Sequence, residues 1–445
     1  MGFFIYFAVY FTNTMHANLK DIYKLFLRHP VISTDSRNIS PGCLFFALKG
    51  ESFNGNTFAA EALCLGAAHS IIDEKKYATN DRCILVDDVL TTLQQLALHH
   101  RRQIDIPVIG VTGTNGKTTT KELIHSVLSG RFRTVATKGN LNNHIGVPLT
   151  LLSITPETEM AIIEMGANHP GEIDFLCRLA LPGFGLITNI GKAHLEGFGG
   201  LEGVIRTKTE LYRFIRSGNG KIFLNSDNPL LKEHASGICS ITYGSPPADL
   251  SMIRASANPF VWLNILFNDQ TELKVTTKLY GKYNAENILA AACIGQYFGI
   301  EPEHIKNALE AYVPANNRSQ FTKTTRNNLI MDAYNANPSS MRTALLAFSE
   351  VTSPKKAVIL GDMLELGDEG DREHQYILSL LEELHPDEVF LVGSVFSRLN
   401  KRREWYCFQD SDLARMWLGH HPLKDHTILI KGSRGIRLEK VLEML

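Results

Sequence analysis

The sequence predicts an α/β protein of three domains, each built on a mainly parallel sheet. Along most of the chain, short runs rich in β-branched residues are followed by stretches with helical spacing of apolar residues, as in 106–128 and 328–348. Length is the second observation, because 445 residues correspond to about three domains of ordinary size. We place the domains at 1–106, 107–318 and 319–445.

Composition is that of an ordinary globular protein, with 44% hydrophobic and 20% charged residues. The formal net charge is −1, and no long basic run indicates a nucleic-acid partner. The seven cysteines are scattered without a CxxC pair. This pattern is typical of reduced thiols in a cytoplasmic protein and not of disulfides or a zinc site.

The N-terminus carries nine apolar residues, 3–11, directly after Gly2. This run is shorter than the roughly 20 residues of a membrane span, and no positive segment of a signal peptide precedes it. We expect translation to begin at Met15, so that 1–14 are an extension. The alternative is a weak membrane-surface tag. In either case we expect no stable membrane insertion.

The first domain is expected to be a small α/β module. We predict a helix from Asn18 onward, strands at 44–48 and 70–72, and helices at 58–65 and 90–102. Three polar side chains lie at strand ends or turns, namely Ser36, Arg37 and Lys49. The guanidinium of an arginine donates hydrogen bonds in pairs, which suits a diphosphate. The alternative is that the arginine and the lysine are solvated on a turn.

The stretch from Gly110 to Leu123 joins a buried strand (106–111) to a helix through the glycine-rich loop GTNGKT. Backbone N–H groups and the helix dipole can hold phosphate at such a junction. Glycines at 113 and 116 let the backbone approach the anion closely. Lys117 supplies a charge for the β- and γ-phosphates, and the hydroxyl of Thr118 can reach a magnesium ion. We therefore predict an ATP site on a central sheet of the P-loop ATPase type.

The match to the usual P-loop is not complete. The common pattern has its first glycine where this chain has Val111, and Gly110 lies one residue too early. The alternative is a glycine-rich connector with a chance GKT. We favour the variant P-loop because strand, loop, Lys-Thr and helix occur in the required order.

Two further polar residues follow predicted strands of the central domain. Glu164 lies near the end of the strand in 159–167, and His194 follows the strand in 184–191. Ligands of open parallel sheets bind beyond the carboxyl ends of the strands. We therefore expect both side chains on the same side as the P-loop, although each alone would more often be a surface residue.

The rest of the central domain is expected to contain a helix at 200–215, a strand in 221–229, a β-rich stretch at 240–280 and a helix at 283–300. Lys208 lies in the first of these helices, where spacing alone describes a solvated lysine. Asn284 and Asn287 start the last helix and could equally be its capping residues.

The third domain is predicted to be Rossmann-like. Strands are expected within 328–333, 356–362, 388–394 and 427–431, a helix near Pro338, and a closing amphipathic helix at 436–445. No GxGxxG follows these strands, so no dinucleotide is implied.

These motifs together resemble the Mur ligase family. The resemblance runs from about Ser33 to the C-terminus and rests on seven motifs in chain order. They are GTNGKTT, TKGNLNNHIGVPLTLL, EMGANHPGEI, NIGKAHLEGFG, DAYNANPSSM, LGDMLELG and IKGSRG.

The resemblance implies an ADP-forming ligase that uses ATP and two Mg²⁺ ions. It would join D-alanyl-D-alanine to UDP-N-acetylmuramoyl-tripeptide through an acyl phosphate, the last cytoplasmic step of peptidoglycan precursor synthesis. The first domain would bind the UDP-sugar, the second ATP and the third the dipeptide. We expect a monomer.

The resemblance also assigns roles to residues of this chain. The implied catalytic residues are Lys117, Glu164, His194 and Lys208, the last as a carbamate. The implied ATP-binding residues are Gly113, Thr114, Asn115, Gly116, Lys117, Thr118, Thr119, Asn284, Asn287, Arg318 and Asp332. The UDP-sugar would be held by Ser36, Arg37, Lys49, Asn140, Asn142 and Asn143. The dipeptide would be held by Asn335, Asn337, Lys431, Ser433 and Arg434. The metal ligands would be Thr118, Glu164, His194 and Lys208.

Three other functions fit the sequence less well. The ligase that adds the third residue to the UDP-sugar dipeptide carries a DNPR signature, which this chain lacks. Folylpolyglutamate synthetase shares the P-loop but is not expected to carry NLNNHIGVPLTLL. A nucleotide-gated binding protein derived from a ligase would be indicated by loss of Lys117, Glu164, His194 or Lys208, and all four are present.

Overall fold

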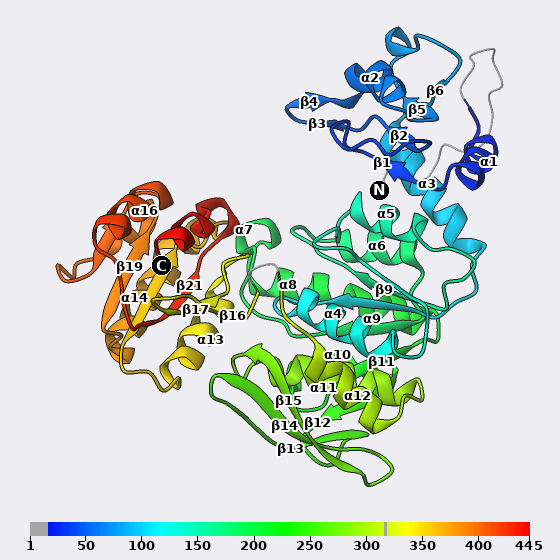
Figure 1. Ribbon diagram of the computed structural model, residues 1–445. Helices are drawn as coiled ribbons and strands as arrows, with labels where there is room; N and C mark the ends of the chain where they lie inside the picture. Colours follow the sequence, from blue (N-terminus) through cyan, green and yellow to red (C-terminus); the bar gives the residue numbers. More distant parts are fainter. Residues whose placement is uncertain (1–16, 316–317) are drawn as a thin grey trace. The chain divides into compact units, whose positions relative to one another are not determined.

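The computed structural model describes residues 17–315 and 318–445 (Figure 1). The extension predicted at 1–14 therefore lies outside the described residues. The chain divides into two compact units. Unit 1 contains the described residues up to Asp105 together with Pro148–Thr155. Unit 2 contains Ile106–Val147 and Pro156–Leu445.

Unit 1 is a small α/β structure on a four-stranded parallel sheet with the order β1-β2-β5-β6. These strands are β1 (Ile32–Ser33), β2 (Leu44–Phe46), β5 (His69–Ile72) and β6 (Cys83–Leu85), and a separate hairpin joins β3 (Lys49–Gly50) to β4 (Phe53–Asn54). The helices are α1 (Leu19–Arg28), α2 (Ala59–Cys64) and α3 (Val89–Arg102), with 3-10 helices at Gly55–Phe58 and Lys75–Tyr77. The helix expected from Asn18 begins there because the Asn18 side chain accepts the backbone N–H of Asp21 at 3.1 Å.

Unit 2 contains a nine-stranded sheet with the order β15-β14-β13-β12-β11-β10-β7-β9-β8. The strands from β8 to β13 pair in parallel, and β13, β14 and β15 are antiparallel. Their bounds are β7 (Val108–Thr112), β8 (Thr134–Ala136), β9 (Met160–Glu164), β10 (Phe184–Ile187), β11 (Lys221–Asn225), β12 (Cys239–Gly244), β13 (Leu250–Ala257), β14 (Phe260–Leu266) and β15 (Glu272–Tyr280). The antiparallel strands account for the β-rich stretch predicted at 240–280.

Helices cover both faces of this sheet. Ile109 and Val111 of β7 pack in one core with Leu123 of helix α4 (Lys117–Leu128), whereas Gly110 faces Leu211 of helix α9 (Glu210–Ser217). Successive residues of a strand point to opposite faces, so α4 and α9 lie on opposite sides. The helices are α4 (Lys117–Leu128), α5 (Gly146–Leu152, which runs into unit 1), α6 (Glu172–Ala180), α7 (Leu195–Phe198), α8 (Leu201–Lys208), α9 (Glu210–Ser217), α10 (Pro229–His234), α11 (Asn284–Tyr297) and α12 (Pro302–Ala311).

A second sheet in unit 2 has six strands in the order β16-β17-β21-β18-β19-β20. All pairs are parallel except β16 with β17. The strands are β16 (Gln320–Lys323), β17 (Asn328–Met331), β18 (Lys356–Gly361), β19 (Glu388–Val392), β20 (Tyr406–Phe408) and β21 (Thr427–Lys431). The helices are α13 (Pro338–Ser349), α14 (Gly370–Leu384), α15 (Ser394–Leu399) and α16 (Ser411–His420), with 3-10 helices η3 (Gly367–Glu369), η4 (Arg434–Ile436) and η5 (Leu438–Met444). The predicted class, α/β with a small N-terminal part, a P-loop sheet and a Rossmann-like C-terminal part, is thus confirmed.

Two element predictions were wrong in detail. The helix expected at 200–215 is two helices, α8 and α9, which meet at Thr209, whose hydroxyl donates to the carbonyl oxygens of Ile205 and Arg206. The amphipathic C-terminal helix is the 3-10 helix η5. Its buried residues, Leu438 and Val441, are three apart, which matches three residues per turn.

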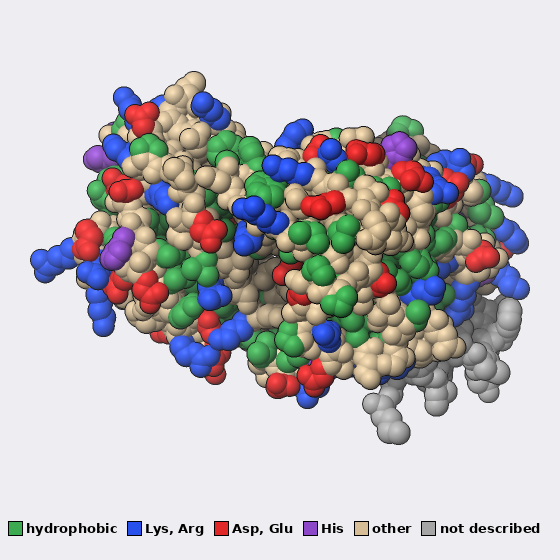
Figure 2. Space-filling view, turned by 90° about the horizontal axis from the view of Figure 1, so that it is seen from below, with side chains coloured by type: hydrophobic (Ala, Val, Ile, Leu, Met, Phe, Trp, Pro, Cys, Tyr) green, Lys and Arg blue, Asp and Glu red, His purple; other side chains and the backbone are tan. Residues whose placement is uncertain are grey.

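All seven cysteines are free thiols, as predicted. Among residues 17–315 and 318–445, no helix combines the length and the apolar character needed to cross a membrane. Positive and negative side chains alternate over the face drawn in Figure 2, in agreement with the formal net charge of −1.

Candidate active site

The predicted glycine-rich loop joins β7 to the N-terminus of α4 in unit 2. Gly113 has φ of 140°, and a Cβ added there would lie 2.0 Å from the Thr188 hydroxyl oxygen. Gly116 has φ of 78°, and its added Cβ would lie 2.7 Å from Oδ1 of Asn287. Only glycine combines this backbone conformation with this lack of space. The loop therefore brings backbone N–H groups to a helix N-terminus, as phosphate binding requires.

Lys117 is held above this loop. Its ammonium nitrogen donates to the carbonyl oxygens of Gly113 at 2.8 Å and Thr114 at 3.0 Å. Burial lowers the pKa of Lys117 to about 8, against the opposing effect of the Glu164 carboxylate. The amine is thus still mostly protonated at neutral pH, and an anion beside it favours the charged form further.

Glu164 ends strand β9 and is almost fully buried, with 1% of its surface exposed. Its Oε1 accepts the Thr118 hydroxyl at 3.0 Å and the Asn142 side-chain amide at 2.7 Å. Its Oε2 is buried without a hydrogen-bond partner. An unpartnered buried carboxylate oxygen beside a hydroxyl suits a hard divalent cation, so this pair fits the predicted magnesium ligands.

A cavity of about 780 Å³ opens in front of the loop. Its walls include the P-loop from Thr114 to Thr119, as well as Glu164 and His194, which confirms that these two side chains lie on the P-loop side of the sheet. Predicted residues that also line it are Asn140, Asn142, Asn143, Asn284, Asn287, Arg318, Asp332, Asn335, Asn337 and Lys431. The cavity thus collects residues from both sheets of unit 2. Gly113, Lys208, Ser433 and Arg434 are not among its lining residues.

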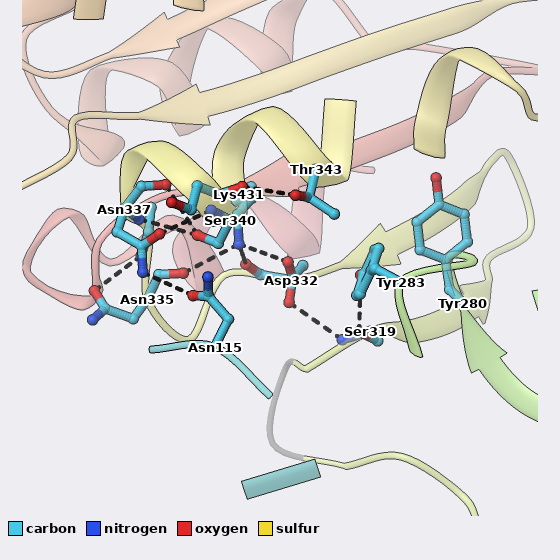
Figure 3. Close-up of polar contacts among 12 residues, drawn as sticks. Asn115, Tyr280, Tyr283, Ser319, Asp332, Asn335, Asn337, Ser340, Thr343 and Lys431 are labelled. Atoms are coloured by element: carbon cyan, nitrogen blue, oxygen red, sulfur yellow. Dashed lines mark hydrogen bonds and ion pairs between the residues drawn. The ribbon is translucent and has the colours of Figure 1, made fainter. Parts of the chain in front are cut away.

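Asp332 and Lys431 form a close ion pair at the ends of β17 and β21 (Figure 3). The distance from Nζ of Lys431 to Oδ2 of Asp332 is 2.6 Å. Lys431 also donates to the Asn335 carbonyl oxygen at 3.3 Å and is 2% exposed. The other carboxylate oxygen of Asp332 accepts the backbone N–H of Ser319 at 3.4 Å. The lysine therefore organises the loop 332–335 and offers little free charge to a ligand.

Asn337 links the loop of the second sheet to the P-loop. Its Oδ1 accepts the backbone N–H of Ser340 and so caps helix α13. Its side-chain amide donates to Oδ1 of Asn115 at 2.8 Å (Figure 3). One asparagine thus starts the helix and contacts the predicted phosphate loop.

Two predicted arginines meet at one aromatic ring. The guanidinium carbon of Arg318 lies 3.5 Å from the ring centroid of Tyr334, and that of Arg434 lies 5.3 Å from it. Ser433 is buried, and its hydroxyl accepts the backbone N–H of Leu364 at 2.9 Å. In the KGSR segment, the serine therefore holds the neighbouring loop in place.

Asn284 and Asn287 do not cap helix α11. Tyr283 is the N-cap residue and makes no side-chain capping bond. The Asn284 amide donates to the carbonyl oxygen of Tyr280 at 2.7 Å, and Asn287 donates to Oδ1 of Asn284 at 2.9 Å. Both asparagines line the cavity, so the capping alternative is wrong.

Lys208, at the end of α8, is buried with 3% of its surface exposed, and not solvated as its spacing indicated. Its nitrogen lies 5.5 Å from the ring centroid of Phe198. Burial first, and the charge of Lys117 second, hold the pKa of Lys208 well below that of an ordinary lysine, although Glu172 and Glu210 act in the opposite direction. The neutral amine is therefore more accessible at Lys208 than at an ordinary surface lysine.

His194 precedes α7, and its buried Nδ1 lies against the Glu365 carboxylate without the geometry of a hydrogen bond. Within the described residues, no group of three His, Cys, Asp or Glu side chains is arranged around a metal position. Of the predicted metal ligands, Thr118 and Glu164 contact each other.

The three UDP-sugar candidates of unit 1 are at least partly exposed. Arg37 pairs with Asp35 at 2.9 Å, and this hydrogen-bonded pair lowers the pKa of Asp35 to about 2. Lys49 pairs with Asp73 at 3.1 Å. Ser36, which lies between Asp35 and Arg37 in the sequence, is half-buried. Asn140, Asn142 and Asn143 belong to unit 2 and line its cavity.

Sequence reasoning missed several residues of this site. Asn189 accepts the backbone N–H of Asn115 at 3.0 Å, and its amide donates to the Asn115 carbonyl oxygen at 3.1 Å. Ser319 receives hydrogen bonds from Asn284 and pairs with the Tyr283 hydroxyl. The position of Asn189 after a strand, in the motif NIGKAHLEGFG, was a usable signal. Nothing local to Ser319 or Tyr283 indicated their roles.

This fold and this cavity define a P-loop protein of the α/β class that binds a nucleotide. Three family models match consecutive parts of the chain. They are described as the Mur ligase family catalytic domain at residues 30–101, the Mur ligase middle domain at 111–295 and the Mur ligase glutamate ligase domain at 317–434. The chain belongs to the Mur ligase family.

Individual relatives extend this match over nearly the whole chain. The UDP-N-acetylmuramoyl-tripeptide–D-alanyl-D-alanine ligase of Bacillus subtilis is 36% identical over 426 residues, covering 93% of this chain and 92% of the relative. The ligase of the same name from Escherichia coli is 34% identical over 423 residues, covering 93% of both chains.

Solved structures of Mur ligases are similar to this chain over nearly its whole length. MurF from Acinetobacter baumannii has a TM-score of 0.82 at 32% identity, covering 93% of this chain and 92% of that one. MurF ligase from Thermotoga maritima in complex with ADP has a TM-score of 0.81 at 27% identity, covering 93% and 96%.

Proposed function

We propose that this protein joins D-alanyl-D-alanine to UDP-N-acetylmuramoyl-tripeptide with the hydrolysis of ATP to ADP and phosphate. The observation that carries the proposal is a single cavity whose walls contain both the P-loop and the 332–340 loop of the second sheet. A ligase of this kind must bring a nucleotide and an incoming amine to one reacting carboxyl group. Relatives at 36% and 34% identity are named for this reaction.

The reaction proceeds in two steps, and the carboxyl group of the tripeptide is the nucleophile in the first and the electrophile in the second. The terminal carboxylate of the tripeptide attacks the γ-phosphorus of ATP, and ADP leaves, which gives an acyl phosphate. The neutral amine of the dipeptide then attacks the acyl carbon, loses a proton and expels phosphate. No covalent bond to the enzyme is required, so the protein contributes positioning, charge and exclusion of water.

The P-loop residues hold the phosphates of ATP in this scheme. Backbone N–H groups of 113–119 and the N-terminus of α4 face the anion, and Lys117 adds a positive charge. With a pKa of about 8 in the free protein, this lysine is readily protonated beside phosphate, and it stabilises charge that builds on the transferred group.

Thr118 and Glu164 would hold one magnesium ion, because a hydroxyl meets a carboxylate there and Oε2 of Glu164 has no other partner. His194 and Lys208 would serve a second ion. When bound, magnesium supplies neutralisation of phosphate charge.

Lys208 would take part as a carbamate. Its neutral amine can attack carbon dioxide and lose one proton, which leaves an anionic N-carboxylate with two oxygen ligands. The burial of the side chain and the charge of Lys117 favour the neutral amine that this reaction needs.

The domain assignment follows from the same scheme. Residues 1–106 bind the UDP-sugar, with Ser36, Arg37 and Lys49 as its candidates. Residues 107–318 bind ATP, and 319–445 bind the dipeptide through the 335–337 and 431–434 segments. We expect the enzyme to act in the cytoplasm and as a monomer.

A coupled ADP-release assay over a panel of UDP-sugar peptides and amines tests this function. Turnover is expected only with UDP-N-acetylmuramoyl-tripeptide plus D-alanyl-D-alanine. Equal rates with a UDP-sugar dipeptide and a free diamino acid would instead assign the preceding ligation. Nucleotide binding without ADP release for any pair would indicate a binding protein.

A further inference from the structure

The inference concerns Ser319, which lies one residue before β16, at the start of the second sheet of unit 2. None of the seven sequence motifs includes it. The residue lines the cavity and is buried, with 4% of its surface exposed. Its surroundings are specific, because its hydroxyl, its backbone N–H and its carbonyl oxygen all have hydrogen-bond partners.

The hydroxyl of Ser319 joins two residues at the start of α11. It lies 3.0 Å from the Tyr283 hydroxyl (Figure 3) and accepts the side-chain amide of Asn284 at 3.1 Å. A hydroxyl both donates and accepts, so these two contacts are compatible. The same amide nitrogen of Asn284 donates to the Tyr280 carbonyl oxygen at 2.7 Å. Both acceptors lie on the nitrogen side of the Asn284 side chain, which fixes its orientation.

From Asn284 these contacts continue to the phosphate loop. The side-chain amide of Asn287 donates to Oδ1 of Asn284 at 2.9 Å. The Asn287 side chain packs against Gly116, where an added Cβ would lie 2.7 Å from Oδ1 of Asn287. Ser319 therefore orients Asn284, and Asn284 orients a side chain that lies on the P-loop.

The backbone of Ser319 holds the side of the cavity that belongs to the second sheet. Its N–H donates to Oδ1 of Asp332 at 3.4 Å (Figure 3), and its carbonyl oxygen accepts the N–H of Tyr280 at 3.3 Å. The residue makes these contacts in a left-handed conformation, with φ of 46°. Glycine would adopt this conformation at lower cost. What serine adds at this position is the hydroxyl.

The residues joined by this hydroxyl form an uncharged part of the cavity wall. Tyr283, Asn284 and Asn287 carry phenol and amide groups, whereas the ammonium group of Lys117 and the helix N-terminus belong to the P-loop. Cations and helix N-termini suit phosphate. Fixed amide groups suit the neutral, hydrogen-bonding part of a ligand, because they determine its orientation in a pocket.

We propose that Ser319 is a positioning residue whose hydroxyl fixes Asn284, and through it Asn287, for binding of the nucleoside part of the nucleotide. The proposal deepens the proposed function and rests on it for the identity of the ligand as an adenine nucleotide. Side chains that are ordered before a ligand arrives avoid the entropy cost of being ordered by it. Ser319 thus increases affinity for the nucleoside and leaves phosphate binding to the P-loop.

The first experiment compares two ligands of the full chain by isothermal titration calorimetry. ADP contains a nucleoside, whereas tripolyphosphate consists of phosphates alone. Ser319→Ala should bind ADP about fivefold more weakly, as expected for loss of one hydrogen bond. The same variant should bind tripolyphosphate with unchanged affinity.

Ser251→Ala is the matched control for this comparison, and it should change neither affinity. Ser251 is also 4% exposed, and it lies in β13 of unit 2. Its hydroxyl donates to the Ala248 carbonyl oxygen at 3.3 Å, and the residue is not among those that line the cavity.

The second experiment separates the hydroxyl of Ser319 from its backbone conformation. Ser319→Gly lacks the hydroxyl but fits the left-handed conformation better than Ser319→Ala. The glycine variant should therefore melt at a higher temperature than the alanine variant and still bind ADP about fivefold more weakly than the unmodified chain. In the background of Asn284→Ala, Ser319→Ala should weaken ADP binding no further, because the serine acts through Asn284.

Three outcomes would overturn the proposal. If ADP affinity follows the melting temperature across the variants, Ser319 is only structural. If ADP and tripolyphosphate binding weaken equally, the effect lies on the phosphate loop. If the effects of Ser319→Ala and Asn284→Ala add, the serine does not act through Asn284. These measurements do not include the reaction, so failure of the ligase assay alongside the expected ADP results would refute the proposed function and not the positioning.

Discussion

The side-chain amide of Asn337 donates a 2.8 Å hydrogen bond to Oδ1 of Asn115, and through it the loop that starts α13 contacts the P-loop. The same asparagine caps α13 through its Oδ1. Because the two contacts use different atoms, substitutions can separate them.

Asn337→Ser should keep the cap, since serine is also a good N-cap residue, and lose the bond to Asn115. The bond is present in the free protein, so its loss should lower the free energy of unfolding by about 1 kcal/mol, and we expect a several-fold lower kcat because the two loops are no longer joined. Asn337→Ala loses the cap as well and should be less stable by about 1 kcal/mol. Steady-state ADP release and thermal melting measure both effects, and an unchanged kcat for Asn337→Ser would remove any role for the bridge.

Lys117 should make nucleotide binding depend on pH. Its folded-state pKa of about 8 means that the attractive ammonium is present below this pH and is lost as the pH rises through it. The dissociation constant for ADP is therefore expected to change little near pH 7, to begin rising as the pH approaches 8 and to rise above it by up to about tenfold per pH unit. Isothermal titration calorimetry from pH 7 to 9.5 measures this.

Lys117→Met provides the control for that profile. It should bind ADP weakly and without the rise above pH 8, and its kcat should fall by at least about 100-fold while the fold stays intact by circular dichroism. Parallel pH profiles for the two proteins would assign the titration to another group.

Lys208 is predicted to act as a carbamate. Lys208→Arg keeps a positive charge but cannot form the carbamate, so it should be inactive. Lys208→Ala should recover part of its activity when a short carboxylic acid such as acetate is added, because the buried site of Lys208 then has room for a replacement carboxylate. Mass spectrometry or ¹³C NMR with labelled carbon dioxide checks the modification directly. An active Lys208→Arg enzyme would make the carbamate untenable.

The Asp332–Lys431 pair should contribute to stability more than to ligand binding, since Lys431 is 2% exposed and 2.6 Å from its partner. Lys431→Met leaves the Asp332 carboxylate without this partner and should destabilise unit 2 by about 3 kcal/mol. The double substitution with Asp332→Leu should recover part of the loss. Thermal melting of the four proteins of this cycle gives the coupling, and additive effects would show that the pair is energetically independent.

Much of the fold was predictable because its signals are local. The buried strand before GTNGKT, the helix after it and the glycines at 113 and 116 are adjacent in sequence, and the chemistry of phosphate binding depends on that short stretch. Strand-to-loop positions also placed Glu164 and His194 on the P-loop side, because parallel strands share the direction of their carboxyl ends.

The sequence by itself determined the class of fold, the phosphate loop and the residue types available to the cavity. Tertiary structure alone decided that Lys208 is buried, that Lys431 is paired with Asp332, and that Glu365 meets His194 across 171 positions, from 194 to 365. Burial and ion pairing depend on neighbours that are distant in the chain. Helical or strand spacing describes only which way a side chain points from its own element. Such spacing therefore carries no information about which residues of other elements the side chain contacts.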